Sequence, residues 1–506
     1  MAAKSPLMEQ YKSIKNEHKD AFLFYRLGDF YELFYDDAVT VSHELELTLT
    51  GKNAGPEGRV PMCGIPYHAA ETYIYRLVQK GYKVAICEQM EDPKKAKGLV
   101  KRDVIRIVTP GTILFENSIA DKSNNYLAYL YETDNDIDAV LADISTGECW
   151  WGIWDKKKER EAFFDMLSVY APTEAVCSLS DNFYGRLEAY CRARLGGCLL
   201  TRRREEGEYP VPHVAEALGD ENIRRVFAWL AAYLKEMMKA DAAEFHTVMP
   251  IREKDCLLLG EDCLRNLEIT RNMRDGGRRG TLLEILDHTH TAMGARLLRR
   301  WLERPLTDVN RIIQRQDGIE ELTGHTTELS QLEEMLEHVF DFERILTRIE
   351  ANTTSPKDLL ALKASLGMIP EIKKLLSGTV SIVLRKLSDQ MDIHSTVYEL
   401  LDRSMNENGT GNIRDGKYIK EGYSAELDEV RSLSENSRKW IADLEEREKE
   451  KTGIKLKIGF NNVFGYYFEI TNANKVPIPE YYMRKQTLVN AERYITPELE
   501  IGRAHV

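Results

Sequence analysis

The 506-residue sequence lacks several signals that would assign it to a specialised class of protein. It contains no run of about 18 apolar residues, which argues against a membrane-spanning helix. Its first residues, MAAKSPLMEQYKSIK, have no apolar core of the kind that secretory signals carry. Eight cysteines are scattered along the chain without a CxxC pair and without histidine at zinc-ligand spacing. We therefore expect reduced, buried thiols in a protein of the cytosol.

A complete nucleotide-binding loop is also missing from the sequence. Residues 411–417 fit the first seven positions of the pattern G-x-x-x-x-G-K, but Tyr418 stands where the pattern needs Ser or Thr to hold Mg²⁺. The preceding residues SMNENGTG form no apolar strand, so the phosphate cradle cannot be built. No other candidate of this type occurs, and no cofactor is predicted for these residues.

Charge is unevenly distributed along the chain. The net charge of −13 argues weakly against a nucleic-acid-binding protein. Residues 1–112 nevertheless carry a net charge of +1 and residues 451–494 a net charge of +4, so the remainder carries −18. This distribution is compatible with a DNA-binding surface at both ends of the chain, although it does not establish one.

The length exceeds what one hydrophobic core supports, and the patterns predict several domains. The N-terminal part has an α/β pattern, with strands expected at 21–27, 81–89 and 102–112 and helices at 29–45 and 70–80. Residues 113–245 begin with three closely spaced strands and continue with alternating helices and strands, which predicts a second α/β domain with a mixed sheet.

Beyond about residue 215 the chain is expected to be almost wholly helical, with apolar residues at spacings of three and four. A long polar helix is predicted at 421–451. Its apolar stripe is thin, so it should project from the body or pair along one narrow seam. It should end at Gly453, where the alternating sequence KLKIGFNNVFGYYFEIT predicts strands.

The segment LFYRLGDFYELFYDD, residues 23–37, contains six aromatic residues around a Gly-Asp turn. Asp29 is a good helix N-cap, and Glu32 three residues later completes a capping box. Phe30 would then share a helical face with Leu33 and Phe34, and the pattern alone favours structural roles. The alternative is that Phe30 is presented outward, as a wedge between stacked bases.

Other polar residues allow two interpretations each. Asp143 ends a predicted strand in LADISTGE, as a metal-binding aspartate would, but metal-dependent phosphoryl transfer needs two or three carboxylates and no partners are evident. A plain strand end is therefore favoured for Asp143. The basic segment DPKKAKGLVKR and the region around 455–485 are either solvated or contact phosphates. The candidate DNA-backbone contacts are Arg26, Lys94, Lys95, Lys97, Lys455, Lys457, Asn461, Asn462, Arg484 and Lys485.

Several long segments, in order, resemble the MutS family of bacterial DNA mismatch repair proteins. They are FYRLGDFYELFYDDA, PMCGIPYHAAETYIYRLVQKGYKVAICEQMEDP, RDVIRIVTPGT, LRNLEITRN, MGARLLRRWLERPL and FGYYFEIT with YMRKQTLVNAERYITPEL. The resemblance covers roughly residues 5–499. It implies a multidomain α/β plus all-α fold. The implied domains are a mismatch-recognition domain at 1–112, a ribonuclease-H-like connector without nuclease activity at 113–250, a helical core with long levers at 251–430, a small β-containing clamp at the lever tip at 431–495, and the start of a returning lever at 496–506.

The resemblance also implies a function. The family's Phe-x-Glu motif falls on Phe30 and Glu32, so Phe30 would insert at a mispaired or unpaired base while Glu32 hydrogen-bonds that base and the DNA kinks. Binding to such duplexes would initiate mismatch repair in the bacterial cytoplasm, at the nucleoid and away from any membrane. A MutL-type partner and a homodimer are implied for the full-length form.

The family's ATPase domain is not contained in these residues, so ATP and Mg²⁺ are expected only for that missing domain. The chain itself should hold no cofactor and should not be catalytic. Its last residues, EIGRAHV, do not continue the helical pattern. They match one reading frame of a common sequencing adapter, and we expect an artefactual tail.

Two other function classes remain as alternatives. One is a metal-dependent nuclease or phosphotransferase built on residues 113–245, in which Asp143→Ala would abolish cleavage. The other is a non-catalytic helical scaffold whose aromatic segment is core. In that case Phe30→Ala would cost about 3–5 kcal/mol of stability.

Overall fold

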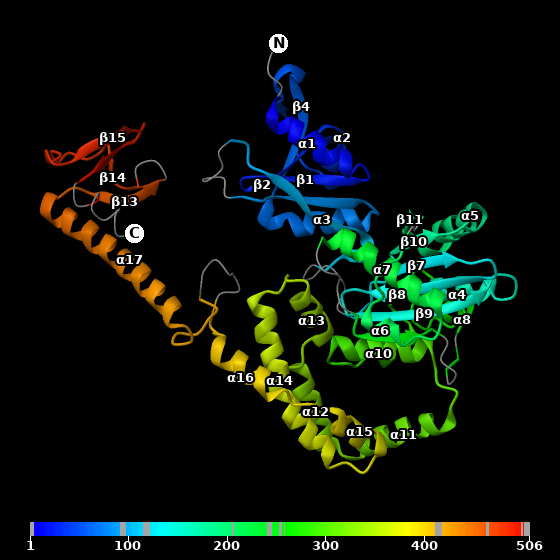
Figure 1. The fold of residues 1–506 in the computed structure, drawn as a ribbon. Helices are drawn as coiled ribbons and strands as arrows, with labels where there is room; N and C mark the ends of the chain where they lie inside the picture. The colour runs from blue at the N-terminus through cyan, green and yellow to red at the C-terminus, as the bar shows by residue number, and fades with distance from the viewer. Residues whose placement is uncertain are drawn as a thin grey trace. The chain divides into compact units, whose positions relative to one another are not determined.

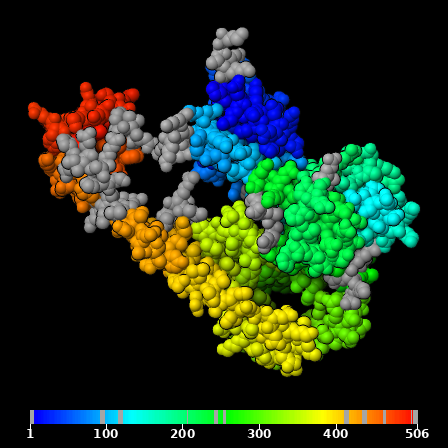
Figure 2. All heavy atoms as spheres, viewed as in Figure 1, coloured from blue at the N-terminus to red at the C-terminus, as the bar shows by residue number. Residues whose placement is uncertain are grey.

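The computed structural model describes residues 5–91, 98–114, 122–204, 207–239, 245–251, 256–257, 259–409, 417–461, 465–496 and 499. The chain divides into two compact units, Met1–Leu401 and Asp402–Val506, which are treated separately below (Figure 1; Figure 2). Among the described residues, no helix is both long and apolar enough to cross a membrane.

The N-terminal part of the first unit is built on a six-stranded sheet. Its strands are β1 (Ala21–Leu27), β2 (Phe30–Phe34), β3 (Thr50–Asn53), β4 (Arg59–Pro66), β5 (Lys83–Gln89) and β6 (Arg102–Val108), in the spatial order β3-β4-β2-β1-β5-β6. Helix α1 (Pro6–Glu17) covers one face, where the Tyr11 ring meets Tyr25 and Phe34 edge-on at centroid distances of 5.4 and 5.0 Å. Helices α2 (Tyr35–Leu45) and α3 (Ala70–Gln79) pack on the other face around Phe24 and Leu33.

The predicted helix at 29–45 is wrong in its first third. Residues 30–34 form β2, and the helix begins only at Tyr35. The capping box of Asp29 and Glu32 is therefore not formed. The reason is pairing: β2 bonds to β1 on one side and to β4 on the other, so its backbone groups are satisfied by a sheet ladder. Tyr31 and Leu33 are two residues apart and share one face of the strand, as the two-residue period of a strand requires.

The second sheet of the first unit is mixed, as the sequence predicts. Its strands are β7 (Leu127–Glu132), β8 (Asp136–Asp143), β9 (Glu148–Asp155), β10 (Glu174–Ser178), β11 (Leu199–Arg202) and β12 (Thr247–Pro250), in the order β11-β10-β7-β8-β9-β12. Strands β7, β8 and β9 are antiparallel, whereas β10, β11 and β12 join in parallel. Strand β12 lies beyond residue 215, where the chain is expected to be almost wholly helical. It is short and is formed by pairing with β9 rather than by its own pattern.

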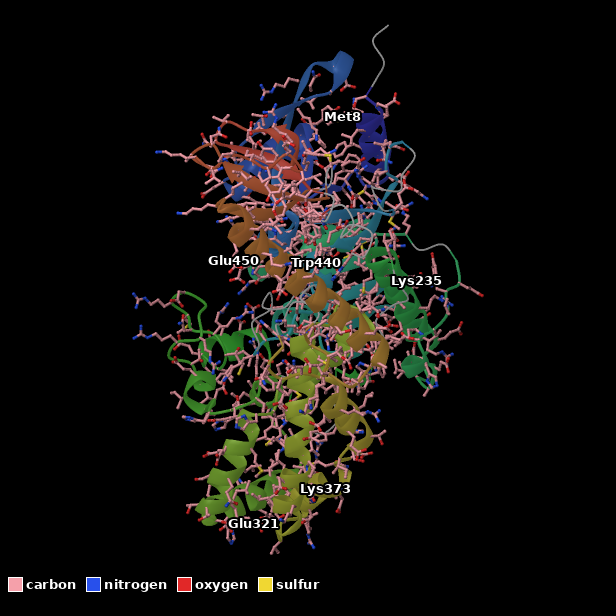
Figure 3. All side chains as sticks on the ribbon, turned by 90° about the vertical axis from the view of Figure 1, so that its left-hand side faces the viewer. Met8, Lys235, Glu321, Lys373, Trp440 and Glu450 are labelled. Carbon is pink, nitrogen blue, oxygen red and sulfur yellow. The ribbon has the colours of Figure 1, made fainter. Side chains whose placement is uncertain are left out.

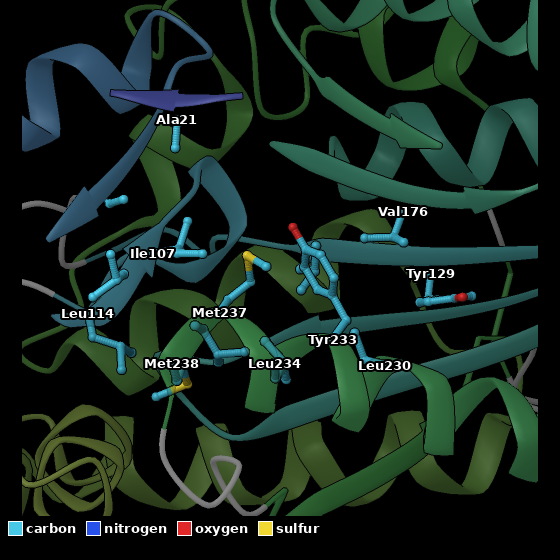
Figure 4. Packing of buried hydrophobic residues seen from close by; sticks show 14 of the residues in the cluster. Ala21, Ile107, Leu114, Tyr129, Val176, Leu230, Tyr233, Leu234, Met237 and Met238 are labelled. Carbon is cyan, nitrogen blue, oxygen red and sulfur yellow. The ribbon is translucent and has the colours of Figure 1, made fainter. Parts of the chain in front are cut away.

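Helices cover both faces of this sheet and connect it to the first sheet. Helices α4 (Arg160–Tyr170) and α5 (Asp181–Tyr190) pack against one face through an aromatic cluster around Phe163. Helix α7 (Glu221–Met238) packs on the other face. Its residues Tyr233, Leu234 and Met237 belong to one core with Ile107 and Leu114 of the N-terminal part (Figure 4). The two sheets therefore share buried apolar side chains through α7.

The remainder of the first unit is helical, in agreement with the sequence pattern. Its helices include α8 (Glu261–Asn266), α9 (Leu282–Leu286), α10 (Ala292–Glu303), α11 (Val309–Gly324), α12 (Thr326–Glu337), α13 (Phe342–Glu350), α14 (Pro356–Ser377), α15 (Ile382–Gln390) and α16 (Ser395–Ser404), the last of which runs into the second unit. Several begin with side-chain caps. In α14, Ser355 and Asp358 form a reciprocal capping box.

The second unit carries a long helix and a small antiparallel sheet. Helix α17 (Ala425–Thr452) is about 42 Å long at 1.5 Å per residue, and Trp440 and Glu450 lie along it (Figure 3). It ends at Gly453, whose φ of 68° is left-handed. The sheet strands are β13 (Leu456–Asn461), β14 (Gly465–Thr471), β15 (Met483–Thr487) and β16 (Ala491–Ile495), in the order β13-β14-β16-β15. The predicted helix with strands after Gly453 is confirmed.

Candidate nucleic-acid interface

The Gly-Asp turn of the aromatic segment joins β1 to β2 as a two-residue hairpin loop. Leu27 pairs with Phe30, and Gly28 has a φ of 60°. A residue with positive φ at the first loop position is what a tight turn with the right-handed strand twist requires, and glycine adopts it without steric cost. The loop is fixed further because Tyr67 N donates to Asp29 O at 3.0 Å. The turn thus holds Phe30 at the first position of a strand.

Phe30 is the one exposed aromatic residue of this segment. Its side chain is 47% exposed, whereas Tyr31, Leu33 and Phe34 are buried. Its cross-strand neighbour on β4 is Pro66, and Gly64 lies next to it, so no large side chain covers the ring from that strand. A Cβ built on Gly64 would touch Phe30 Cδ1 at 3.6 Å. The structure therefore presents the Phe30 ring at the surface.

Glu32 lies on the same sheet face as Phe30, two residues along β2, and is directly opposite Gly64. Its carboxylate accepts a hydrogen bond from Lys52 Nζ of β3 at 2.5 Å, and both side chains are partly buried. Sequence reasoning missed Lys52. The two residues are twenty positions apart, and only the pairing of β3 and β2 with β4 brings them together. The alternating hairpin pattern TGKN…RVPMCGIP is the only sequence signal for it.

Arg26 faces the other side of the sheet. Its pairing with Tyr31 places it on the face opposite Phe30 and Glu32. The guanidinium stacks 3.8 Å from the Tyr67 ring centroid and forms an ion pair with Glu88 at 3.2 Å. Arg102, part of the basic segment, is likewise buried, and its Nε donates to Arg26 O at 2.7 Å. The DNA contact predicted for Arg26 remains a prediction.

The remaining candidate contacts divide between two places. Lys94, Lys95, Lys97 and Asn462 lie outside the described residues, as does the side chain of Asn461. Lys455, Lys457, Arg484 and Lys485 are exposed in the second unit.

The second unit's sheet separates these four basic residues into two pairs. Lys457 is on β13, Arg484 and Lys485 are on β15, and two strands lie between them, about 14 Å at 4.8 Å per strand. The structure therefore does not gather them into one cluster. Arg484 Nη1 also pairs with Glu492 Oε1 at 3.0 Å.

One further basic residue of this sheet was missed. Arg493 of β16 lies on the same face as Lys457, because both are in register with Glu469 of β14. It pairs with Glu469 at 3.0 Å and stacks 4.4 Å over the Tyr467 ring. The alternation in AERYI was the available signal.

Asp143 is a closed structural group in the second sheet. Its carboxylate is fully buried and accepts four hydrogen bonds, from Ser145 N, Ser145 Oγ, Asn124 Nδ2 and Asn125 N, at 2.9, 2.6, 2.8 and 3.1 Å. In the part of the chain that the structure describes, no three His, Cys, Asp or Glu side chains are arranged to hold a metal ion. This arrangement does not favour the nuclease alternative.

Comparisons with known proteins bear on the assignment once this geometry is considered. Residues 5–117 match the model for MutS domain I, residues 262–456 match MutS domain III, and residues 422–503 match MutS family domain IV. The chain belongs to the MutS family. The Phe30 hairpin lies within the MutS domain I match, and the four-stranded sheet of the second unit lies within the domain IV match.

Individual members of the MutS family are similar over nearly the whole chain. The DNA mismatch repair protein MutS of Caldanaerobacter subterraneus subsp. tengcongensis is 42% identical over 98% of this chain, and that of Bacillus subtilis is 41% identical over 99%. The Clostridium beijerinckii protein of the same name is 43% identical over 99% of the chain. The chain spans 58% of the length of the first two relatives and 54% of the third.

The family matches also bear on the domain division, which stays a prediction. Residues 118–261, which hold most of the second sheet, lie between the first two matches. The boundary predicted at 430 falls inside the continuous helix α17, and the two matches that meet there overlap from 422 to 456.

Proposed function

We propose that this chain recognises mispaired or unpaired bases in duplex DNA, as the first step of mismatch repair. Phe30 acts as the wedge and Glu32 as the hydrogen-bonding partner of the displaced base. The observation that carries this proposal is the exposure of Phe30 within an otherwise buried aromatic segment, at the end of a tight hairpin. The names of the MutS relatives, which are DNA mismatch repair proteins, support the substrate class.

The energetics of a wedge favour defective sites. A phenylalanine buries about 150–250 Å² when fully covered, so covering the exposed half of Phe30 removes roughly 100 Å² from water. At about 25 cal/mol per Å² this is worth about 2.5 kcal/mol. Unstacking a base step costs a few kcal/mol in a paired duplex and less where pairing is already defective. The gain therefore roughly balances the cost at a paired step and exceeds it at a mispair.

Glu32 tunes selectivity in this mechanism. In the free protein Lys52 compensates its charge at 2.5 Å. DNA phosphates repel a carboxylate, and a hydrogen bond from a base to the carboxylate offsets part of that cost. The binding free energy contributed by Glu32 is therefore most favourable where an unpaired base offers an N–H donor. We expect Glu32→Gln to strengthen binding to the matched duplex by about 1 kcal/mol and to change binding to the mismatched duplex much less, so that the ratio between the two affinities falls.

The basic residues of the second unit supply affinity without sequence preference. Lys455, Lys457 and Lys485 are exposed, and contacts of this kind to phosphates release counterions. Each phosphate contact that is lost should reduce the slope of log K against log salt by about 0.9. Substituting one of these lysines should weaken matched and mismatched duplexes equally.

For the whole protein we propose the properties that the resemblance implies. These are ATP and Mg²⁺ in an ATPase domain, ATP dependence of the mismatch-repair function, DNA kinking at the mispair, a homodimer, a MutL-type partner and a place in the bacterial cytoplasm. We further propose that the second sheet, with its three antiparallel strands followed by three that join in parallel, is the ribonuclease-H-like connector.

The test is fluorescence anisotropy at low salt with the 506-residue chain on two duplexes. One contains a single G·T mispair or an unpaired T, and the other is its fully paired control. Phe30→Ala is compared with Phe340→Ala, which removes a ring of nearly the same exposure, 48%, from the helical part of the first unit. We expect the wild type and Phe340→Ala to prefer the defective duplex and Phe30→Ala to lose that preference at an unchanged melting temperature. The proposal is wrong if the folded wild type binds both duplexes equally, or if Phe30→Ala discriminates as well as the wild type.

A further inference from the structure

A small cavity lies between the second sheet and helix α10, away from the hairpin of Phe30. Its volume is about 250 Å³. Trp150 of β9, Tyr170 at the end of α4 and Tyr126 before β7 form its aromatic side. The other side is lined by basic residues and one acid, which are Arg271, Arg296, Arg299, Arg300, Arg304 and Glu303. The lining thus holds five guanidinium groups and one carboxylate.

Three of these arginines are neutralised by carboxylates. Arg296 pairs with Asp341 and Glu343 at 2.7 and 2.6 Å. Arg299 pairs with Glu303 at 2.8 Å and Arg300 with Glu148 at 2.5 Å. These pairs fix the arginines in place around the cavity. Of the two that remain, Arg271 is exposed, whereas Arg304, the residue that follows α10, is buried.

Arg304 is buried without an acceptor. Only 7% of the residue is exposed, and neither Nη1 nor Nη2 has a hydrogen-bond partner among the described residues. The guanidinium lies 4.5 Å from the Trp150 ring centroid and 4.8 Å from that of Tyr170. These contacts use the faces of the guanidinium and give a modest gain. The N–H groups of Nη1 and Nη2 lie in its plane and find no acceptor among the described residues. Burying an unpaired charge costs several kcal/mol, and arginine does not escape the cost by losing its proton.

The two rings beside Arg304 carry unmatched donors as well. Trp150 Nε1 and the Tyr170 hydroxyl are buried and have no partner among the described residues. The cavity is thus lined by N–H and O–H groups from three side chains without an acceptor for them. Trp150 Nε1 and the guanidinium can act only as hydrogen-bond donors and never as acceptors.

Water fits this lining less well than an anion does. At about 30 Å³ per water molecule the cavity has room for several, so it also has room for one tetrahedral oxyanion. Water brings as many donors as acceptors and no charge, whereas phosphate oxygens are acceptors that match a planar guanidinium. Burial of the guanidinium also lowers the pKa of Arg304 to about 10, against smaller opposite contributions from Tyr126 and Glu148.

We propose that this cavity binds a small multivalent oxyanion of the phosphate class, held by Arg304 with Trp150 Nε1 and the Tyr170 hydroxyl. The anion supplies the acceptors that no described residue provides to Nη1 and Nη2 of Arg304. Because the lining comes from the second sheet and from α10, the bound anion ties these two parts of the first unit together. This site is separate from the DNA-binding surface and does not depend on it.

The test is titration of the 506-residue chain with inorganic phosphate and with pyrophosphate, against chloride at matched ionic strength. Thermal melts and calorimetry follow binding. The melting temperature should rise with the logarithm of oxyanion concentration, since the ligand binds the folded state only. Arg304→Gln should bind at least tenfold more weakly and should fold with an equal or higher melting temperature without ligand. Arg385→Gln, which removes an exposed arginine of α15 outside the cavity, should bind as the wild type does.

Tyr170→Phe provides a second variant that preserves the ring and removes only one donor. It should weaken binding several-fold, and it keeps the test decisive if Arg304→Gln does not fold. Titration with glycerol 3-phosphate distinguishes a phosphate ester from a free phosphate ion as the ligand. Binding as tight as that of inorganic phosphate indicates a phosphate ester, and weaker binding indicates the free anion. The proposal is overturned if phosphate and pyrophosphate stabilise the wild type no more than chloride does. It is also overturned if Arg304→Gln or Tyr170→Phe retains full affinity.

Discussion

Glu174, at the start of β10, holds the junction between the two sheets of the first unit, and its hydrogen bonds predict a measurable coupling. The residue is fully buried. Its carboxylate accepts from Tyr233 Oη of α7 at 2.5 Å, from Gly111 N at 3.1 Å, from Thr201 Oγ1 at 3.4 Å and from Thr109 Oγ1. Burial and the nearby Glu174 charge raise the pKa of Tyr233, so its hydroxyl remains a donor. One carboxylate therefore connects the TPGT turn, two strands and α7.

The magnitude of a substitution follows from these bonds. In Glu174→Gln one oxygen becomes an NH₂ group, which faces two donors instead of accepting from them. A hydrogen bond to a charged group is worth about 1.5–3 kcal/mol, and partial rearrangement of the hydroxyls reduces the loss, so we expect about 2–3 kcal/mol. Tyr233→Phe removes one such bond and should cost about 2 kcal/mol. Since both changes remove the same interaction, the double variant should cost at least 1 kcal/mol less than their sum.

Urea unfolding of the four proteins, followed by circular dichroism, measures this cycle. Glu188→Gln, an exposed acid of α5, is the matched control and should stay within about 0.5 kcal/mol of the wild type. Additivity of Glu174→Gln and Tyr233→Phe within about 0.5 kcal/mol would refute the reasoning, because independent sites behave in that way.

Three further predictions concern single residues. Burial, with smaller contributions from Asp220 and Asp136, raises the pKa of Asp138 to about 7, so the folded state keeps the carboxyl proton at pH values where the unfolded chain has lost it. The stabilisation that comes from this pKa difference is complete below about pH 4 and is lost as the pH rises to 7. Asp138→Asn should remove this dependence of stability on pH. At pH 8 its free energy of unfolding, measured in urea, should exceed that of the wild type by about 2 kcal/mol. Phe34→Ala should cost about 3–5 kcal/mol and Phe30→Ala less than about 1, because only Phe34 is fully buried; equal losses would contradict the surface position of Phe30. Asp143→Asn should lower the melting temperature, and Mg²⁺ or Mn²⁺ should not stabilise the wild type in thermal melts.

Much of the architecture could be predicted from local patterns. The apolar runs at 21–27 and 102–108 form β1 and β6, and the long polar helix ends at Gly453 as expected. These elements carry their own signals, namely period, length and a terminating glycine. Strand β12 carries no such signal, because four residues gain strand geometry only by pairing with β9.

The candidate site was harder to predict, for a physical reason that concerns Phe30 itself. The residues of FYELF satisfy a helical period and an alternating period almost equally well over five positions. In a helix Phe30 shares a face with the buried Leu33 and Phe34, which favours core. In the strand it shares a face with Glu32, and Leu33 points the other way. The exposure of Phe30 thus depends on pairing with β4, some thirty residues away, and so does the contact of Glu32 with Lys52.

The position of β2 within its sheet also favours the wedge role that we propose for Phe30. Strand β2 is internal, with ladders to β1 and β4, so the backbone of Phe30 is held on both sides before any ligand arrives. Ordering a free loop residue costs about 1–2 kcal/mol, and a residue fixed in a sheet avoids that cost on binding. The gain of about 2.5 kcal/mol from covering the ring is then available to offset unstacking. A gain of this size is enough at a weakened base step and too small to open paired DNA at every position. The same residue placed on a mobile loop would lose most of that margin.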